Sequence, residues 1–177
     1  MKKLHFLLLA LFAAIVMVGC ETPGIDQPQP EPFPTPDPAE VPLISTYPAF
    51  ITEDTTEDIT IILNTKGTAA NNFTGELYAH TGVLTSASKD NGDWKHVLSS
   101  WGQNIPECKL VNKGNNVWYY TIKGGVRAWY KVNTNEVVTH LAFVFRSSDN
   151  KIEVKDNGAD IFIELADCVS PAAIDGL

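Results

Sequence analysis

Short stretches of alternating apolar and polar residues dominate the chain from residue 49 onward. A period of two is typical of β-strands with one buried face, and no stretch of twelve residues carries a convincing helical period. Seven or eight such strands in about 125 residues predict an all-β fold, an antiparallel β-sandwich of the immunoglobulin-like type. The strands are expected at 59–64, 75–80, 108–112, 117–123, 126–132, 137–145 and 160–165, with a further edge strand beginning at Phe50 and Ile51.

Clusters of Gly, Asn and Asp separate these strands, as is typical of tight turns. They occur at 113–116, 133–135 and 156–158, and the pair Gly124-Gly125 links two expected strands directly. A link this short predicts a tight hairpin.

The first 19 residues have the pattern of an export signal. Lys2 and Lys3 precede a mostly apolar stretch at 6–18, which is shorter than the ~20 residues that a spanning helix needs. The tetrad Met17-Val18-Gly19-Cys20 resembles the lipobox of bacterial lipoproteins, in which cleavage leaves an acylated Cys at the mature N-terminus. The resemblance implies that Cys20 is lipidated and anchors the protein to a membrane. A plain secretory signal before an ordinary Cys is the alternative.

Residues 20–48 contain nine of the eleven prolines, five acids and no Lys or Arg. Such a composition favours extended polyproline II structure, so we expect a disordered, semi-rigid stalk; a ligand for an aromatic groove is the alternative. The predicted organisation is a signal peptide at 1–19, a stalk at 20–48 and one β-sandwich domain at 49–177.

The formal net charge is −8, and no basic stripe accompanies it, which argues against a nucleic-acid partner. The histidines and cysteines lack the spacing of a zinc site, so no metal or other cofactor is expected. The acids between 149 and 160 could hold Ca²⁺, although they lack the EF-hand pattern. Cys108 and Cys168 could form a disulfide in an exported protein, but spacing alone does not show whether their Cβ atoms meet.

Several aromatic residues fall where strand parity predicts solvent. In the strand at 75–80, Tyr78 and His80 lie opposite the apolar set, and in the strand at 126–132 Trp129 lies between two cations. Trp94 and Trp101 belong to a polar loop at 85–104, and a loop of this length in a small domain is usually functional. The alternative is that the loop tryptophans cap the sandwich as satellite core, and that a neighbouring strand or the stalk covers Trp129.

Exposed planar rings beside hydrogen-bonding side chains suit carbohydrate, because a pyranose ring stacks its C–H face on Trp or Tyr. The same residue types also anchor protein interfaces, and parity does not choose between the two partners.

A family resemblance is carried by a series of short motifs. They are YPAFITED at 47–54, DITIILN at 58–64, LYAHTGV at 77–83, Asp93-Trp94, Ser100-Trp101-Gly102, FVFRSSD at 143–149 and DIFI at 160–163. The series resembles the non-catalytic immunoglobulin-like modules that precede the catalytic barrel in alpha-amylase-family proteins of Bacteroidetes, and more distantly small starch-binding modules. The resemblance implies α-glucan binding through Tyr78, His80 and Trp94, with Trp129 as a further stacking residue. Because that module normally leads into a catalytic domain, the chain is expected to be a free-standing surface module or an N-terminal fragment of a longer enzyme.

Nothing in the sequence assembles an active site, since the acids occur mainly in turns and no nucleophile motif is present. We therefore expect a monomeric, membrane-anchored, non-catalytic carbohydrate-binding module of a glycan-utilisation system. Its expected ligand is an α-glucan or a similar polysaccharide, and other glycan-uptake proteins are candidate partners. The expected location is the outer membrane, at the cell surface, with a periplasm-facing anchor as the alternative. A protein-interaction or structural immunoglobulin-like lipoprotein is the alternative function.

Overall fold

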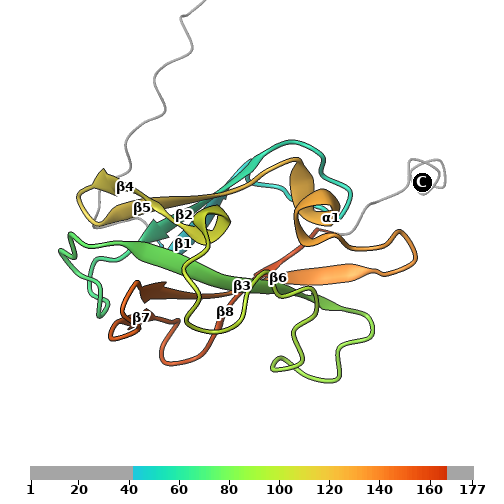
Figure 1. Ribbon diagram of the computed structural model, residues 1–177. Helices are drawn as coiled ribbons and strands as arrows, with labels where there is room; N and C mark the ends of the chain where they lie inside the picture. Colours follow the sequence, from blue (N-terminus) through green and yellow to red (C-terminus); the bar gives the residue numbers. More distant parts are fainter. Residues whose placement is uncertain (1–41, 167–177) are drawn as a thin grey trace, which may run out of the picture. The chain divides into compact units, whose positions relative to one another are not determined.

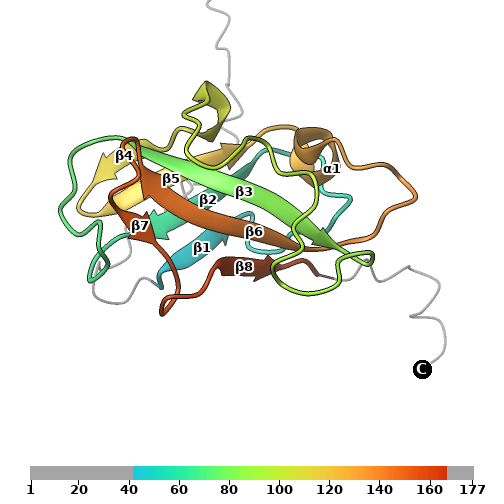
Figure 2. The same ribbon diagram turned by 60° about the horizontal axis from the view of Figure 1, so that its bottom comes forward.

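The computed structural model describes residues 42–166, which form two antiparallel β-sheets (Figures 1 and 2). The predicted signal peptide, Cys20, the stalk up to residue 41 and Cys168 lie outside the described residues. No helix in the described part is long and apolar enough to cross a membrane. The strands are β1 (Ile44–Tyr47), β2 (Ile59–Asn64), β3 (Leu77–Thr85), β4 (Val111–Gly114), β5 (Val117–Ile122), β6 (Val138–Ser147), β7 (Glu153–Val154) and β8 (Ile161–Glu164).

The strand order confirms the predicted immunoglobulin-like sandwich. One sheet has the order β1-β2-β5-β4; in the other, β6 pairs with β3 on one side and with β7 and β8 on the other. Labelled A to G along the chain, these sheets have the order A-B-E-D and C-F-G of the constant-type immunoglobulin domain, with β7 and β8 together in the place of strand G. Figure 2 shows the β3–β6 layer in front of the strands of the other sheet.

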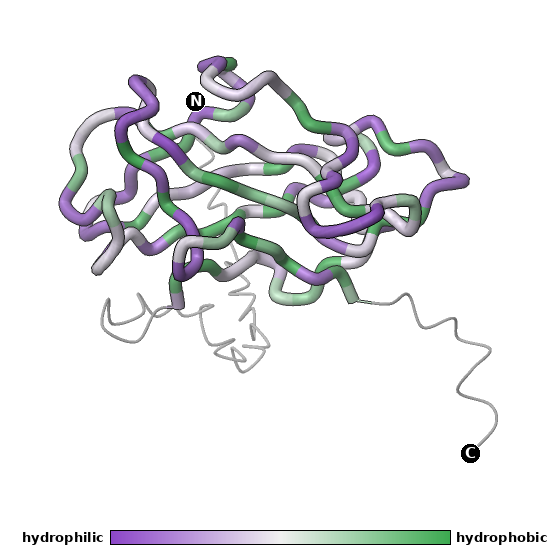
Figure 3. Tube along the Cα trace, turned by 90° about the horizontal axis from the view of Figure 1, so that it is seen from below, coloured by the Kyte–Doolittle hydropathy of each residue, from purple (hydrophilic) through white to green (hydrophobic). Residues whose placement is uncertain are grey.

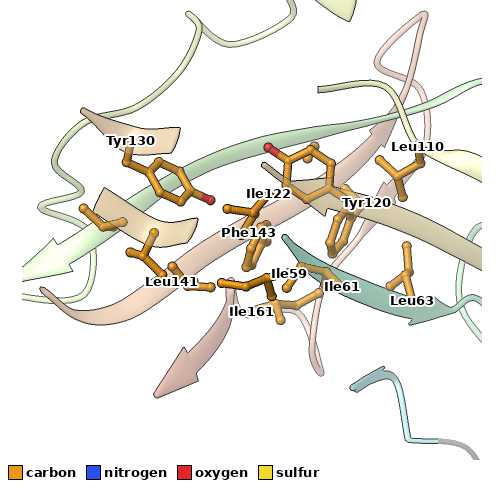
Figure 4. Packing of buried hydrophobic residues seen from close by; sticks show 14 of the residues in the cluster. Ile59, Ile61, Leu63, Leu110, Tyr120, Ile122, Tyr130, Leu141, Phe143 and Ile161 are labelled. Carbon is orange, nitrogen blue, oxygen red and sulfur yellow. The ribbon is translucent and has the colours of Figure 1, made fainter. Parts of the chain in front are cut away.

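The core lies between the two sheets and follows the alternation in the sequence. Figure 3 shows hydrophobic and hydrophilic residues following one another at short intervals along the trace. Every second residue of β2 and β5 is buried, and β6 is buried continuously from Leu141 to Ser147. The core side chains of these three strands are Ile59, Ile61, Leu63, Trp118, Tyr120, Ile122, Leu141, Phe143 and Phe145. Figure 4 shows several of them, among them Ile61, Tyr120 and Phe143, packed together. Each fully buried apolar side chain of this size contributes about 1.5–3 kcal/mol to folding.

The predicted strand at 126–132 is wrong, because this segment begins with the short helix α1 (Gly125–Tyr130). Val126 and Tyr130 are buried, and Trp129 packs against the same core. The spacing of these three residues suits one helical turn as well as the alternation suits a strand, and so short a segment does not separate the two periods. Gly124 and Gly125 therefore lead from β5 into a helix instead of turning a hairpin.

Other strand boundaries differ from expectation as well, and β3 extends to Thr85 instead of ending at residue 80. β1 lies in the segment predicted as stalk, so the folded domain includes Ile44–Tyr47, and Phe50 and Ile51 begin no strand. Prolines flank β1 on both sides and leave its backbone free to pair with β2. Cys108 belongs to a 3-10 turn, η1 (Pro106–Cys108), and the following strand starts only at Val111.

Candidate functional site

The outer face of the β3–β6–β8 sheet carries the candidate site. The register places Tyr78 opposite Arg146 and His80 opposite Val144, while Ala142 on β6 lies opposite both Gly82 and Phe162. All these positions have the parity opposite to the core residues, so the sequence assigned Tyr78 and His80 to the correct face. The loop between β3 and η1, residues 86–105, crosses this face.

Four rings form what we call the aromatic cluster: His80 and Phe162 from the sheet, and Trp94 and Trp101 from the loop. The His80 and Trp94 rings are stacked, with centroids 5.6 Å apart and planes at 25°, whereas Trp101 meets His80 edge-on at 5.0 Å and 81°. Phe162 meets Trp94 edge-on, with centroids 6.2 Å apart. Trp101 is 47% exposed, while the other three rings are part-buried. The two indoles are thus steeply inclined to each other.

Backbone pairing holds the first half of the loop against β3. Lys95 exchanges two hydrogen bonds with Val83, at 2.8 and 2.9 Å, and so extends the sheet beyond its edge strand. The His96 side chain reaches Glu136 at 2.8 Å between Nε2 and Oε2, which ties the loop to the connection after α1. The indole Nε1 of Trp94 donates to the Asn91 carbonyl at 2.8 Å, so one edge of this ring is already satisfied within the loop.

Tyr78 is not an exposed binding residue, which corrects the prediction made from parity. The residue is only 7% exposed, and its backbone pairs with Lys109 in an isolated β-bridge. Its hydroxyl donates to Glu76 at 3.1 Å, and the guanidinium of Arg146 lies 5.7 Å from its ring centroid. Burial raises the pKa of Tyr78, and the hydrogen bond to Glu76 acts in the same direction. Tyr78 therefore supports the cluster from its side without offering a ring face to a ligand.

Trp129 does not join the aromatic cluster either. It lies on α1, packs against the hydrophobic core, and donates from Nε1 to the Tyr120 hydroxyl at 2.9 Å. The ring centroids of Trp129 and Tyr120 are 6.4 Å apart. The prediction that placed Trp129 on a solvent face assumed a strand here, and it fails because the segment is helical.

His80 is the titratable group at the centre of the cluster. Its Nδ1 is buried without a hydrogen-bond partner in the described structure. Burial lowers the pKa of the imidazole, the positive charge of Arg146 lowers it further, and Asp160 acts in the opposite direction. The ring is therefore neutral at pH 7 and stacks on Trp94 as an uncharged group.

We expect this lowered pKa to make the domain less stable in mild acid. Below about pH 6.5, the unfolded chain takes up a proton at His80 that the folded chain does not, so the free energy of unfolding decreases down to the folded pKa. Urea unfolding of the wild type and of His80→Phe, followed between about pH 7 and pH 5, measures the effect. His80→Phe should lose less stability over this range. An equal loss in both proteins would assign the pH dependence to other groups.

Two residues of this face were not predicted as site residues. Phe162 was detectable, because Ile161 and Ile163 were expected in the core and Phe162 has the opposite parity. Arg146 follows the core residue Phe145, so parity places it on the outer face. Only the register with β3 and the path of the loop place its guanidinium beside Tyr78.

The cysteine and metal predictions have partial outcomes. Cys108 is fully buried and forms no disulfide within residues 42–166, and burial raises the pKa of its thiol to about 11. Cys168 lies outside the described residues, so the pairing of the two cysteines stays a prediction. Among residues 42–166, no group of three or more His, Cys, Asp or Glu side chains could hold a metal ion.

A depression of about 610 Å³ lies away from the aromatic cluster, lined by residues that include Lys66, Thr68 and Asn157.

Neither a family model nor a curated protein matches the chain.

Proposed function

We propose that this protein is a membrane-anchored, non-catalytic carbohydrate-binding module of a glycan-utilisation system, with an α-glucan or a similar polysaccharide as its ligand. One observation carries the proposal: Trp101 presents a half-exposed indole beside His80 and Trp94 on the outer face of the sheet. An exposed aromatic group of this size on a small domain is a typical binding feature. The membrane anchor and the location at the outer-membrane surface rest on residues 1–20, and the stalk at 20–41 separates that anchor from the domain.

The inclination of the two indoles supports a curved glucan over a flat one. Trp94 is nearly parallel to His80, while Trp101 is nearly perpendicular to it. A β-1,4-linked chain is flat and suits coplanar rings, whereas an α-1,4-linked chain turns at each linkage and suits rings that are inclined to each other. The ligand class therefore agrees with the shape of the cluster.

The acids near the site support a binding role over a catalytic one. Asp93 pairs with Lys95 at 2.7 Å, and its carboxylate also accepts a hydrogen bond from the backbone of Lys89. Asp149 accepts from the Ser147 hydroxyl at 2.6 Å and from the backbone of Lys151. Both carboxylates stabilise turns, which is the usual role of Asp in such positions.

Affinity electrophoresis in native gels that contain starch or glycogen tests the proposal. We expect the full-length protein to be retarded, and Trp101→Ala to raise the dissociation constant about tenfold, or about 1.4 kcal/mol, because it removes the most exposed ring of the aromatic cluster. Phe50→Ala is the matched control, since Phe50 is an 85% exposed ring outside the aromatic cluster. Its retardation should equal that of the wild type.

Gels with a β-1,4-glucan separate the proposed ligand class from carbohydrate in general. Unretarded migration of the wild type in every polysaccharide would contradict the proposal and favour the alternative of an immunoglobulin-like protein-interaction module.

A further inference from the structure

Arg146 is a buried cation without a counter-charge. It lies on β6, is only 1% exposed, and takes part in none of the ion pairs found among residues 42–166. Its guanidinium donates only to neutral oxygens: from Nη1 to Asn104 Oδ1 at 2.8 Å and to the Ser147 carbonyl at 3.2 Å, and from Nη2 to the Gln103 carbonyl at 2.5 Å. Its Nε is buried without a partner in the described structure.

A buried guanidinium without an opposite charge destabilises the folded protein. A buried charge without an opposite charge costs several kcal/mol, and a well-packed apolar residue at the same position is often more stable. An unsatisfied buried N–H adds to this cost. Stability of the sandwich therefore does not account for an arginine at this position.

Apart from the bond to its neighbour Ser147, the hydrogen bonds of Arg146 go to residues of the turn that contains Trp101. Gln103 and Asn104 follow Trp101 by two and three residues, and Ser100 and Gln103 close the turn around it through bonds of 3.2 and 3.1 Å. Asn104 also donates to the Ser148 carbonyl at 2.9 Å. The planar guanidinium can reach two acceptors of the turn at once, which a lysine ammonium on its flexible stem does less well.

We propose that Arg146 is a positioning residue that holds the Ser100–Asn104 turn on the sheet and thereby sets the indole of Trp101 against His80. The expected effect of Arg146 on glucan affinity rests on the proposed function. The positioning itself is a property of the free protein and is measurable without ligand.

The test uses full-length protein labelled with 5-fluorotryptophan and followed by ¹⁹F NMR, with the Trp101 signal assigned from Trp101→Phe. In Arg146→Met we expect the Trp101 signal to move toward the position of free tryptophan, while Trp118, which is buried in the other sheet, keeps its signal. Arg146→Lys should give an intermediate shift. Asn104→Ala keeps Arg146 but removes one acceptor of its guanidinium, together with the bond to the Ser148 carbonyl, and should move Trp101 in the same direction by a smaller amount.

Two further readouts separate positioning from a merely structural role. The pKa of His80, followed by ¹H NMR, should rise in Arg146→Met because a neighbouring positive charge is removed, and should change less in Arg146→Lys. In starch gels, Arg146→Met should weaken binding about tenfold, as Trp101→Ala does.

An unchanged Trp101 signal in both Arg146→Met and Asn104→Ala overturns the positioning role, whatever happens to binding. A shift of the Trp118 signal in Arg146→Met would mean that this variant also disturbs the core. In that case the Trp101 signal of Asn104→Ala alone decides whether Arg146 has the positioning role. A wild-type protein that binds no glucan contradicts the proposed function, yet the ¹⁹F comparison still tests the positioning role.

Discussion

Replacing Gly125 with alanine is expected to destabilise the domain by more than about 3 kcal/mol. Gly125 is the first residue of α1 and has a φ of +82°, where a side chain is strained by about 1–2 kcal/mol. A Cβ at this position would also lie 1.7 Å from the Thr55 carbonyl oxygen and 2.7 Å from its carbon. Both are backbone atoms, so the chain cannot relieve the overlap by rotating a side chain. Either the helix or the loop at residues 52–56 has to move.

Gly124→Ala is the matched control for this prediction. Its φ is +68°, but the nearest atom to its Cβ would be the Ala128 Cβ at 3.8 Å, an ordinary contact. We expect this variant to lose only about 1–2 kcal/mol from backbone strain. Urea unfolding at pH 7 measures both variants. Equal losses would mean that the close approach of Thr55 does not constrain α1.

Gly82→Val is expected to lose about 2–3 kcal/mol and to displace the first half of the loop. Gly82 lies on the outer face of β3, where a Cβ would meet the Lys95 carbonyl oxygen at 2.8 Å and a methyl of Val97 at 3.0 Å. The loop can approach the sheet and pair Lys95 with Val83 only because residue 82 has no side chain. A valine there should separate Trp94 from His80 and weaken binding to starch at least as much as Trp101→Ala does.

Gly92→Val serves as the control in the same loop. A Cβ at Gly92 would have only the Asp90 carboxylate nearby, at 3.3 Å, and this end of a side chain can move. We expect a loss below about 1 kcal/mol and unchanged retardation in starch gels. Calorimetric melting and affinity electrophoresis of the two variants give the comparison. Gly82→Val with wild-type retardation would show that the path of the loop over β3 is not needed for binding.

Strand parity predicted most of the sandwich because both faces of a β-strand repeat every two residues. Trp118 and Tyr120 on β5, and Phe143 on β6, are buried as the alternation indicates, and the strand order follows the immunoglobulin arrangement. Parity failed at 126–132, where a six-residue helix fits the same apolar pattern. It also missed β1, whose four residues follow a proline-rich segment and pair with β2.

Strand parity and the length of the loop also predicted part of the site. Parity placed Tyr78 and His80 on the outer face, and the long polar loop marked Trp94 and Trp101. Whether such a residue is exposed depends on what crosses the face. Tyr78 is buried in the folded protein, whereas Trp101 is about half exposed.

Local sequence thus determined which residues face the core and which face outward, because side-chain direction along a strand depends only on position. The tertiary structure alone decided which outward residues meet. His80 and Trp94 come together because Gly82 admits the loop, and Trp101 joins them where its turn is bonded to Arg146. Those contacts connect residues that are 14 to 43 positions apart, as His80–Trp94 and Gln103–Arg146 show, and no short-range pattern encodes distances of that kind.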